Sequence, residues 1–210
     1  MVKDILKGYK NRQVEIQISE YHSPSLIVFY PGAKSIPDEP LFYWLKDILD
    51  INETSYIYFN FLWDQLRRTL TDVELDFMEI VEEEIKLSFR YLRQFKHKNI
   101  TIVSRSTGCR ANCIIHNGFL SNQFLINKLF WVDPHTSIKY VDSLNYKKDY
   151  VYIGRNCKKF TSDFVFMLNK NTTLRETSSL NHLLSRKHLV KNDVSCYQAL
   201  RQFKSDLLDL

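Results

Sequence analysis

Residues 102–111 pass from a strand-like run into a turn of small side chains, Ile102-Val103-Ser104-Arg105-Ser106-Thr107-Gly108-Cys109-Arg110-Ala111. The isoleucine and valine are typical of a buried strand, and the residues after Gly108 are compatible with the start of a helix. A serine at the tip of a tight strand-to-helix turn needs small residues two positions before and after it. Ser104 and Gly108 meet that requirement. The stretch therefore predicts that the Ser106 hydroxyl stands above the end of a strand.

Further runs of apolar residues, rich in β-branched and aromatic side chains, are spread along the chain. They cover 25–30, 55–60, 100–103, 129–132, 150–153 and 164–167, and residues 13–21 alternate between apolar and polar side chains. Short continuous apolar runs are typical of strands that are buried on both faces of a parallel sheet. We therefore expect a sheet in which most strands are parallel.

Helical patterns lie between these runs. Residues 41–49 form one, and residues 72–95 form the longest, with acidic residues expected in its first turn. The C-terminal segment places five apolar residues on one helical face, Val194, Tyr197, Leu200, Phe203 and Leu207. Strands that alternate with helices predict an α/β fold with helices flanking the sheet. No repeat and no linker is apparent, so residues 1–210 are expected to form a single domain.

The composition is that of an ordinary globular protein. The 210 residues are 44% hydrophobic and carry a net charge of +5, which excludes a disordered or collagen-like chain. No apolar run approaches the roughly 18 residues that a membrane helix needs, and the basic residues are not clustered as in nucleic-acid-binding proteins. We expect neither a membrane span nor a nucleic-acid partner.

The four cysteines, Cys109, Cys113, Cys157 and Cys196, contain no CxxC pair. Cys109 and Cys113 form only a weak zinc pattern with His116, and a second cluster is missing. Free thiols in a reducing compartment explain the cysteines better, so a cytoplasmic location is expected by default. Phosphate-binding and dinucleotide-binding glycine motifs are absent from the sequence. The sequence thus implies no metal and no organic cofactor.

Two other groups of residues have ordinary explanations. The acidic residues from Asp72 to Glu84 are expected to form a solvated helix face rather than a metal site. Most aromatic residues are expected in the core. The aromatic residues after Gly32 (Phe42, Tyr43 and Trp44) and those after Asn60 (Phe61 and Trp63) are candidates to line an apolar pocket above the sheet that suits an acyl chain.

Three segments together resemble the α/β-hydrolase superfamily, in particular its small serine hydrolases. Residues 102–111 are similar to the G-x-S-x-G nucleophile motif, with Ser104 in place of the first glycine. Residues 26–33 are similar to the strand and glycine turn that supply a donor to the oxyanion hole. Residues 179–184 contain His182, where the family has its catalytic histidine. The resemblance extends over residues 25–210 and implies a three-layer, α/β-hydrolase-like sandwich.

The resemblance also implies roles for individual residues. Ser106 would be the nucleophile, and His182 would be the general base that takes its proton. The backbone N–H groups of Thr107 and Ala33 would form the oxyanion hole, with Lys34 as the alternative to Ala33.

The acid that orients the histidine is where this chain departs from the family. The family places an aspartate a few residues after the penultimate strand, and this chain has Cys157 there. Asp133, at the end of the preceding strand, and Asp163 are the replacements, with Asp133 slightly favoured. A site without an acid is the third alternative. His135 is a minor alternative to His182 as the base.

The predicted function is a serine hydrolase, esterase- or thioesterase-like, whose partner is a small-molecule acyl ester or thioester. An acyltransferase that uses the same serine and histidine is one alternative, because an alcohol acceptor in place of water changes only the second step. A non-catalytic binding or scaffold protein of this fold is another, favoured by the missing acid and the missing first glycine. A phosphate- or nucleotide-binding protein is the least favoured. The sequence does not specify an oligomeric state.

Overall fold

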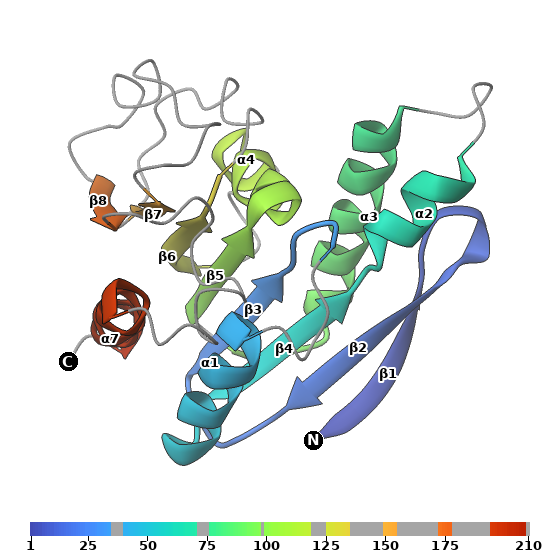
Figure 1. The fold of residues 1–210 in the computed structure, drawn as a ribbon. Helices are drawn as coiled ribbons and strands as arrows, with labels where there is room; N and C mark the ends of the chain where they lie inside the picture. The colour runs from blue at the N-terminus through green and yellow to red at the C-terminus, as the bar shows by residue number, and fades with distance from the viewer. Residues whose placement is uncertain are drawn as a thin grey trace.

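The strands form one eight-stranded sheet in the order β1-β2-β4-β3-β5-β6-β7-β8 (Figure 1). The structure is a computed structural model, and it describes residues 1–34, 40–70, 76–97, 99–118, 125–134, 149–154, 172–177 and 194–208. The strands are β1 (Val2–Lys7), β2 (Gln13–Ser19), β3 (Ser25–Tyr30), β4 (Ser55–Asn60), β5 (Asn99–Arg105), β6 (Leu125–Val132), β7 (Asp149–Gly154) and β8 (Thr172–Thr177). β2 is antiparallel to both β1 and β4, and all other neighbours are parallel. The prediction of a mostly parallel sheet is confirmed.

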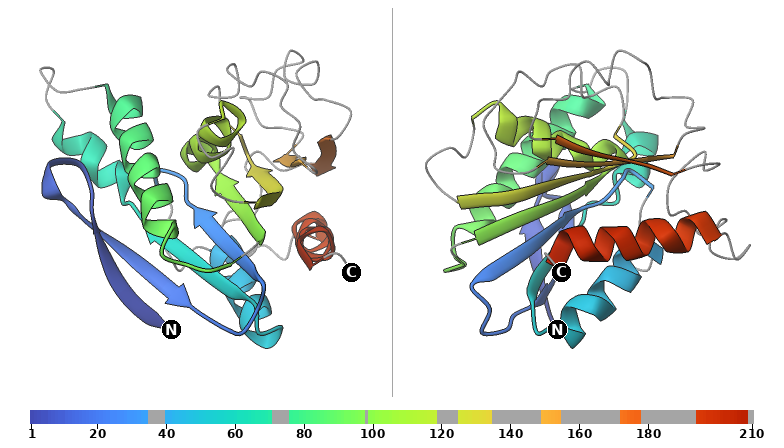
Figure 2. Two further views of the ribbon diagram at one scale, coloured as in Figure 1. Left: turned by 180° about the vertical axis from the view of Figure 1, so that it is seen from behind. Right: turned by 90° about the vertical axis from the view of Figure 1, so that its left-hand side faces the viewer.

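Helices cover both faces of the sheet. They are α1 (Pro40–Ile51), α2 (Trp63–Thr69), α3 (Phe77–Leu92), α4 (Arg110–His116) and α7 (Val194–Leu208). α1 and α7 lie on one face, and α2, α3 and α4 lie on the other (Figure 2). This is the predicted three-layer arrangement. Among the described residues, no helix is long and apolar enough to cross a membrane.

The core consists of two apolar layers separated by the sheet. Along β5, Ile102 belongs to the layer under α3 and α4, and Val103 belongs to the layer under α1 and α7. Both side chains are fully buried. This alternation explains why the strand is apolar without a break, because each successive side chain enters one layer or the other.

Two helices differ in detail from their predicted patterns. α3 begins at Phe77, and Asp76 is its N-cap, whose carboxylate accepts the Met78 N–H at 2.7 Å. The predicted start at Asp72 lies outside the described residues. In α7, Tyr197 is 46% exposed, although the sequence pattern predicts it on the apolar face.

Some elements lack a clear sequence pattern. β1 is an edge strand whose side chains are mostly exposed, so it has no apolar run to reveal it. α2 has only seven residues, too few for a clear periodicity. β8 is polar at most positions, and the run at 164–167 that was predicted as the last strand lies outside the described residues.

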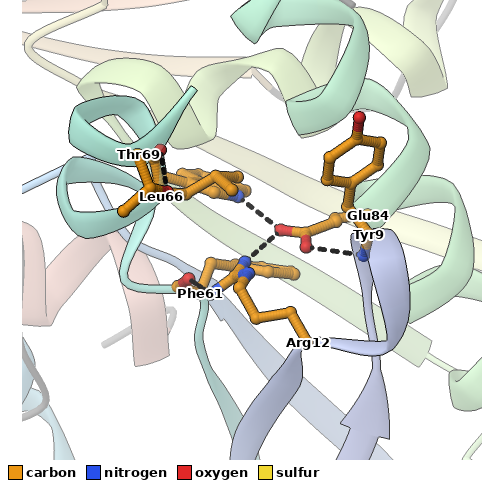
Figure 3. A network of polar contacts seen from close by, with 7 residues as sticks. Tyr9, Arg12, Phe61, Leu66, Thr69 and Glu84 are labelled. Atoms are coloured by element: carbon orange, nitrogen blue, oxygen red, sulfur yellow. Dashed lines mark hydrogen bonds and ion pairs between the residues drawn. The ribbon is translucent and has the colours of Figure 1, made fainter. Parts of the chain in front are cut away.

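One residue of the acidic stretch is not solvated. Glu84 of α3 is fully buried and accepts hydrogen bonds from the Tyr9 N–H (3.0 Å), the Trp63 indole N–H (2.8 Å) and Arg12 (2.5 Å) (Figure 3). Arg12 also donates to the Phe61 carbonyl. We call these residues the Glu84 network. The prediction of a wholly solvated face is therefore wrong at Glu84, because the β1–β2 turn folds over this turn of the helix.

The Glu84 network also explains the aromatic residues after β4. Phe61 and Trp63 are fully buried in the layer under α3, and their rings stack with centroids 4.4 Å apart. They are part of the core and do not line a pocket above the sheet. The prediction is wrong for these two residues because the indole N–H is directed at a buried carboxylate.

The C-terminal helix is attached to the sheet by buried charges. Lys128 of β6 donates to the carbonyls of Asp206 (2.9 Å) and Leu207 (3.2 Å) at the end of α7, where helix carbonyls lack partners. The Asp206 carboxylate accepts two hydrogen bonds of 3.0 Å from Arg175 and another from Tyr152. Burial disfavours the charge on Asp206, but these donors outweigh it, so its pKa lies below the usual range.

Candidate active site

Ser106 occupies a strained turn at the carboxyl end of the central strand β5. The strand ends at Arg105, Ser106 begins a 3₁₀ turn that extends to Cys109, and α4 follows directly. Ser106 has a φ angle of 48°, in the left-handed region that side chains other than glycine rarely adopt. Such strain is concentrated at functional positions. The side chain is partly exposed, so the hydroxyl is positioned to meet a ligand.

Gly108 allows this turn to pack against β3. A Cβ atom on Gly108 would lie 2.3 Å from the Tyr30 carbonyl oxygen and 2.5 Å from that of Pro31. No side chain fits, because both obstacles are backbone atoms. The small residue that the sequence required at this position is therefore explained by close contact between the turn and the end of β3.

The same contact brings together the two segments that were predicted to form an oxyanion hole. Thr107 precedes Gly108, and Ala33 lies just beyond Pro31 in the loop after β3. The Ala33 carbonyl accepts the Asp64 N–H of α2 at 2.8 Å, which fixes the loop. Both Thr107 and Ala33 are partly exposed. Their segments are thus neighbours on the side of the sheet edge where Ser106 stands.

Ser104 stands where the resembled motif has its first glycine. It is fully buried, and its hydroxyl donates to the Phe130 carbonyl of β6 at 2.9 Å. Asn112 of α4 donates to the same carbonyl at 3.2 Å. A serine is accommodated here because its hydroxyl finds a partner on the neighbouring strand.

The thiol nearest to Ser106 is not an alternative nucleophile. Cys109 is fully buried, and its sulfur lies 3.8 Å from the Val132 carbonyl. Burial raises the pKa of the Cys109 thiol far above its usual range, and it raises the pKa of Cys113 to about 11. Both thiols are therefore protonated at neutral pH and weakly reactive. Both are free, as predicted, whereas Cys157 and the side chain of Cys196 lie outside the described part of the chain.

Asp133 is located one strand away from Ser106. It follows β6 directly, is 4% exposed and has a φ angle of 47°. Its N–H donates to the Tyr152 carbonyl of β7 at 2.9 Å. β5 and β6 are parallel, with Arg105 opposite Val132, so Asp133 and Ser106 belong to the same edge of the sheet.

The sequence analysis did not single out Arg105, which is only 2% exposed. Burial lowers the pKa of its guanidinium, and the charge of Asp133 acts in the opposite direction. The sequence shows only a basic residue at the end of a strand and directly before the candidate nucleophile, which does not indicate burial.

The remaining candidates lie elsewhere. His182, Asp163 and His135 are outside the described residues. His116 is buried at the far end of α4 and pairs with Asp149 at the start of β7, with 3.2 Å between nitrogen and oxygen. Within the described ranges, no group of three or more histidine, cysteine or acidic side chains could hold a metal ion.

Solved structures share this architecture over nearly the whole chain. A serine hydrolase homologue from Coxiella burnetii has a TM-score of 0.66 at 14% identity, with 96% of each chain covered. A serine hydrolase without a lid from Xanthomonas campestris has a TM-score of 0.65 at 13% identity, covering 96% of this chain and 94% of that one. A thermophilic esterase from Thermogutta terrifontis has a TM-score of 0.70 at 11% identity, and the match covers 99% of this chain and 93% of the esterase chain.

The chain has the α/β-hydrolase fold. No protein-family model and no curated protein sequence matches it. The resemblance stated from residues 26–33 and 102–111 is confirmed at the level of the fold. Within this fold, Ser106 lies in the turn between the central strand β5 and helix α4.

Proposed function

We propose that the chain is a serine hydrolase that cleaves an acyl ester or thioester, with Ser106 as its nucleophile. The observation that carries the proposal is the left-handed backbone of Ser106 at the end of β5, held against β3 by Gly108. Ordinary turns also contain this conformation, as at Lys10, but at Ser106 it coincides with the end of a central strand and the start of α4. A nucleophile needs it, because it directs the hydroxyl away from the sheet.

The proposed reaction has two steps. Ser106 Oγ attacks the acyl carbonyl while His182 takes the hydroxyl proton, and the bond to the alcohol or thiol breaks as His182 returns that proton to the leaving group. Water, activated by His182, then attacks the acyl-serine and releases the acid. The N–H groups of Thr107 and Ala33 hold the negative oxygen at each tetrahedral stage. Asp133 and Asp163 are the carboxylates that could orient His182.

Two observations support Ser106 rather than Cys109 as the nucleophile. Ser106 is partly exposed, whereas Cys109 is buried and protonated. The Gly108 contact also brings the segments of Thr107 and Ala33 together beside Ser106. The structural neighbours named as serine hydrolases and esterases share the fold.

The test is labelling of the purified protein with a fluorophosphonate, which reacts only with an activated serine. We expect labelling of the wild type and none of Ser106→Ala. Ser23→Ala is the matched control, because Ser23 precedes β3 at the opposite edge of the sheet, and it should label like the wild type. His182→Ala should slow turnover of a responsive ester or thioester by roughly 10⁴-fold or more.

Failure of the folded wild type to label would overturn the proposal in favour of a binding or scaffold protein with this fold. Labelling that survives in Ser106→Ala would place the nucleophile elsewhere. If labelling depends on Ser106, a panel of esters and thioesters assayed with and without added alcohol separates hydrolysis from acyl transfer, because transfer yields a new ester instead of the free acid.

A further inference from the structure

The segments before and after the candidate nucleophile are attached to the same atom of β6. The Ser104 hydroxyl at the end of β5 donates to the Phe130 carbonyl at 2.9 Å. The Asn112 side-chain amide of α4 donates to the same carbonyl at 3.2 Å. Ser104 lies before Ser106 in the chain and Asn112 lies after it. One oxygen of β6 therefore joins the strand to the helix across the strained turn.

Both donors make this contact inside the protein. Ser104 and Asn112 are fully buried, and a hydrogen bond shielded from water is stronger than one at the surface. A third side chain contacts the same strand, because the Cys109 sulfur lies 3.8 Å from the Val132 carbonyl. The end of β6 thus accepts contacts from residues before, within and after the turn.

Asn112 is a costly residue for a buried position. Within the part of the chain that the structure describes, its amide oxygen has no hydrogen-bond partner. A buried acceptor without a partner lowers stability, whereas an apolar side chain carries no such cost. What Asn112 adds over an apolar residue is its amide N–H, which is directed at Phe130.

We propose that Ser104 and Asn112 are positioning residues that hold the turn at Ser106 through their shared acceptor. We call Ser104, Asn112 and the Phe130 carbonyl the Phe130 clasp. The inference rests on the proposed function and adds two buried residues to that site, both of which act through Ser106. It also explains what Ser104 contributes where the resembled motif has glycine, because glycine has no hydroxyl to donate.

The clasp complements the contact made by Gly108. β5 lies between β3 and β6. Gly108 packs the turn against the end of β3, and the clasp attaches both flanks of the turn to β6. A strained residue persists only where its surroundings hold it. Ser106, with its φ angle of 48°, is thereby held from both neighbouring strands.

A double-mutant cycle with Ser104→Ala, Asn112→Ala and the double variant tests the clasp. Its readouts are the midpoint of urea unfolding, the rate constant of fluorophosphonate labelling per folded molecule, and amide hydrogen exchange at residues 106–109. Each single variant keeps one donor on Phe130, so we expect it to label about threefold more slowly than the wild type. The double variant releases both flanks and should label about thirtyfold more slowly or worse, which exceeds the product of the single effects.

The unfolding midpoints separate positioning from a general loss of stability. Asn112→Ala should unfold close to the wild-type midpoint, because it removes an unsatisfied oxygen together with a hydrogen bond, yet it should label more slowly. Ser55→Ala is the matched control. Ser55 is fully buried at the start of β4, and its hydroxyl donates to the Tyr21 carbonyl at 3.0 Å. Ser55→Ala should unfold at lower urea, as Ser104→Ala does, but label at the wild-type rate.

Three results would overturn the inference. The first is a folded double variant that labels at the wild-type rate. The second is single effects that simply multiply, because independent residues do not share one task. The third is Ser55→Ala labelling as slowly as Ser104→Ala, because loss of any buried hydrogen bond would then suffice. Should the double variant not fold, hydrogen exchange of the single variants decides. Exchange at residues 106–109 that is faster than in Ser55→Ala supports the clasp, and equal exchange overturns it.

The two proposals fail separately. If the wild type does not label, the proposed hydrolase function fails, but the unfolding midpoints and hydrogen exchange still report on the clasp. A loss of midpoint in the double variant that exceeds the sum of the single losses, with faster exchange confined to residues 106–109, would still support it. Additive losses with no local change in exchange would overturn it.

Discussion

The Glu84 network and the strand-end residues Arg105 and Asp133 place buried charge in two different surroundings. Glu84 accepts hydrogen bonds from a backbone N–H, an indole and Arg12, and it joins the β1–β2 turn, the segment after β4 and helix α3 (Figure 3). Arg105 and Asp133 instead lie at strand ends beside two left-handed residues. The first arrangement satisfies a carboxylate and fastens three segments together. The second lies beside the strained turn at Ser106.

The difference teaches that burial of a charge does not by itself indicate a functional site. Glu84 is more completely buried than Asp133, yet its hydrogen-bond donors lie in the β1–β2 turn and at the start of α2. What distinguishes the strand ends at Arg105 and Asp133 is the partly exposed and strained Ser106, which directly follows Arg105. The following predictions test that distinction, from the largest effect to the smallest.

Glu84→Gln should destabilise the protein by about 3 kcal/mol, because it removes the charge that balances the partly buried Arg12. Urea unfolding measures the loss, and Glu83→Gln, an exposed neighbour on α3, should change stability by less than about 0.5 kcal/mol. Labelling per folded molecule should not change. If folded Glu84→Gln labels much more slowly than the wild type, the Glu84 network acts on Ser106, and its purely structural role is contradicted.

Gly108→Ala should cost about 2 kcal/mol of stability, because the new Cβ meets the Tyr30 and Pro31 carbonyl oxygens and the turn must move. The same movement should slow labelling of the folded protein at least tenfold. Gly118→Ala is the control: its φ angle of 82° makes alanine strained, but nothing lies within 4 Å of its Cβ. Gly118→Ala should lose about 1 kcal/mol of stability and label at the wild-type rate. Equal labelling of the two variants would contradict the role of the β3 contact.

Asp206 offers a third buried charge with a defined pH dependence. Hydrogen bonds from Arg175 and Tyr152 hold its pKa below the usual range in spite of burial, so its ionised form stabilises the folded state. That contribution is present above the unfolded pKa of about 3.9 and is lost as pH falls through the lower folded pKa.

At pH 7, Asp206→Asn should therefore be less stable than the wild type by roughly 1–2 kcal/mol. The difference in unfolding free energy between the two should shrink as the pH falls below about 4. Urea titrations at pH 7, 4 and 2.5 measure it. A difference that grows in acid would show that the folded pKa is raised instead.

Ser106→Gly should raise stability by up to about 1 kcal/mol while abolishing labelling, because glycine adopts the left-handed conformation without strain. Lys10→Gly is the matched control, since Lys10 is exposed and has a φ angle of 49° in the β1–β2 turn. Lys10→Gly should gain a similar amount of stability and label at the wild-type rate. A loss of stability in Ser106→Gly alone would mean that the hydroxyl makes contacts that outweigh the strain.

Much of the fold was predictable because most strands of a parallel sheet are buried on both faces. The runs at 25–30 and 55–60 coincide with β3 and β4 for that reason. β1 was not predicted because an edge strand buries few side chains. Glu84 was wrongly predicted to be solvated because helical spacing does not show which part of a helix another segment covers. Both errors concern contacts between segments far apart in the chain.

The candidate site was predictable only where local sterics decide it. The small residue at Gly108 follows from the strand-to-helix turn, and the structure adds the carbonyl oxygens that forbid a side chain. The positions of His182 and Asp163 lie outside the described residues, so their roles stay predictions. Arg105 was missed because the charge of a single residue at a strand end gives no sign of burial.

The sequence by itself determined the alternation of strands and helices and the turn at Ser106, because these depend on side-chain periodicity and on sterics within a few residues. Only the tertiary structure decided that Gly108 packs on β3, that Arg12 reaches Glu84, and that Arg105 and Asp133 are neighbours. Those relations join residues tens of positions apart, and they arise from strand order and register. A local pattern cannot encode them, because it specifies neither which strands become neighbours nor which charges are enclosed.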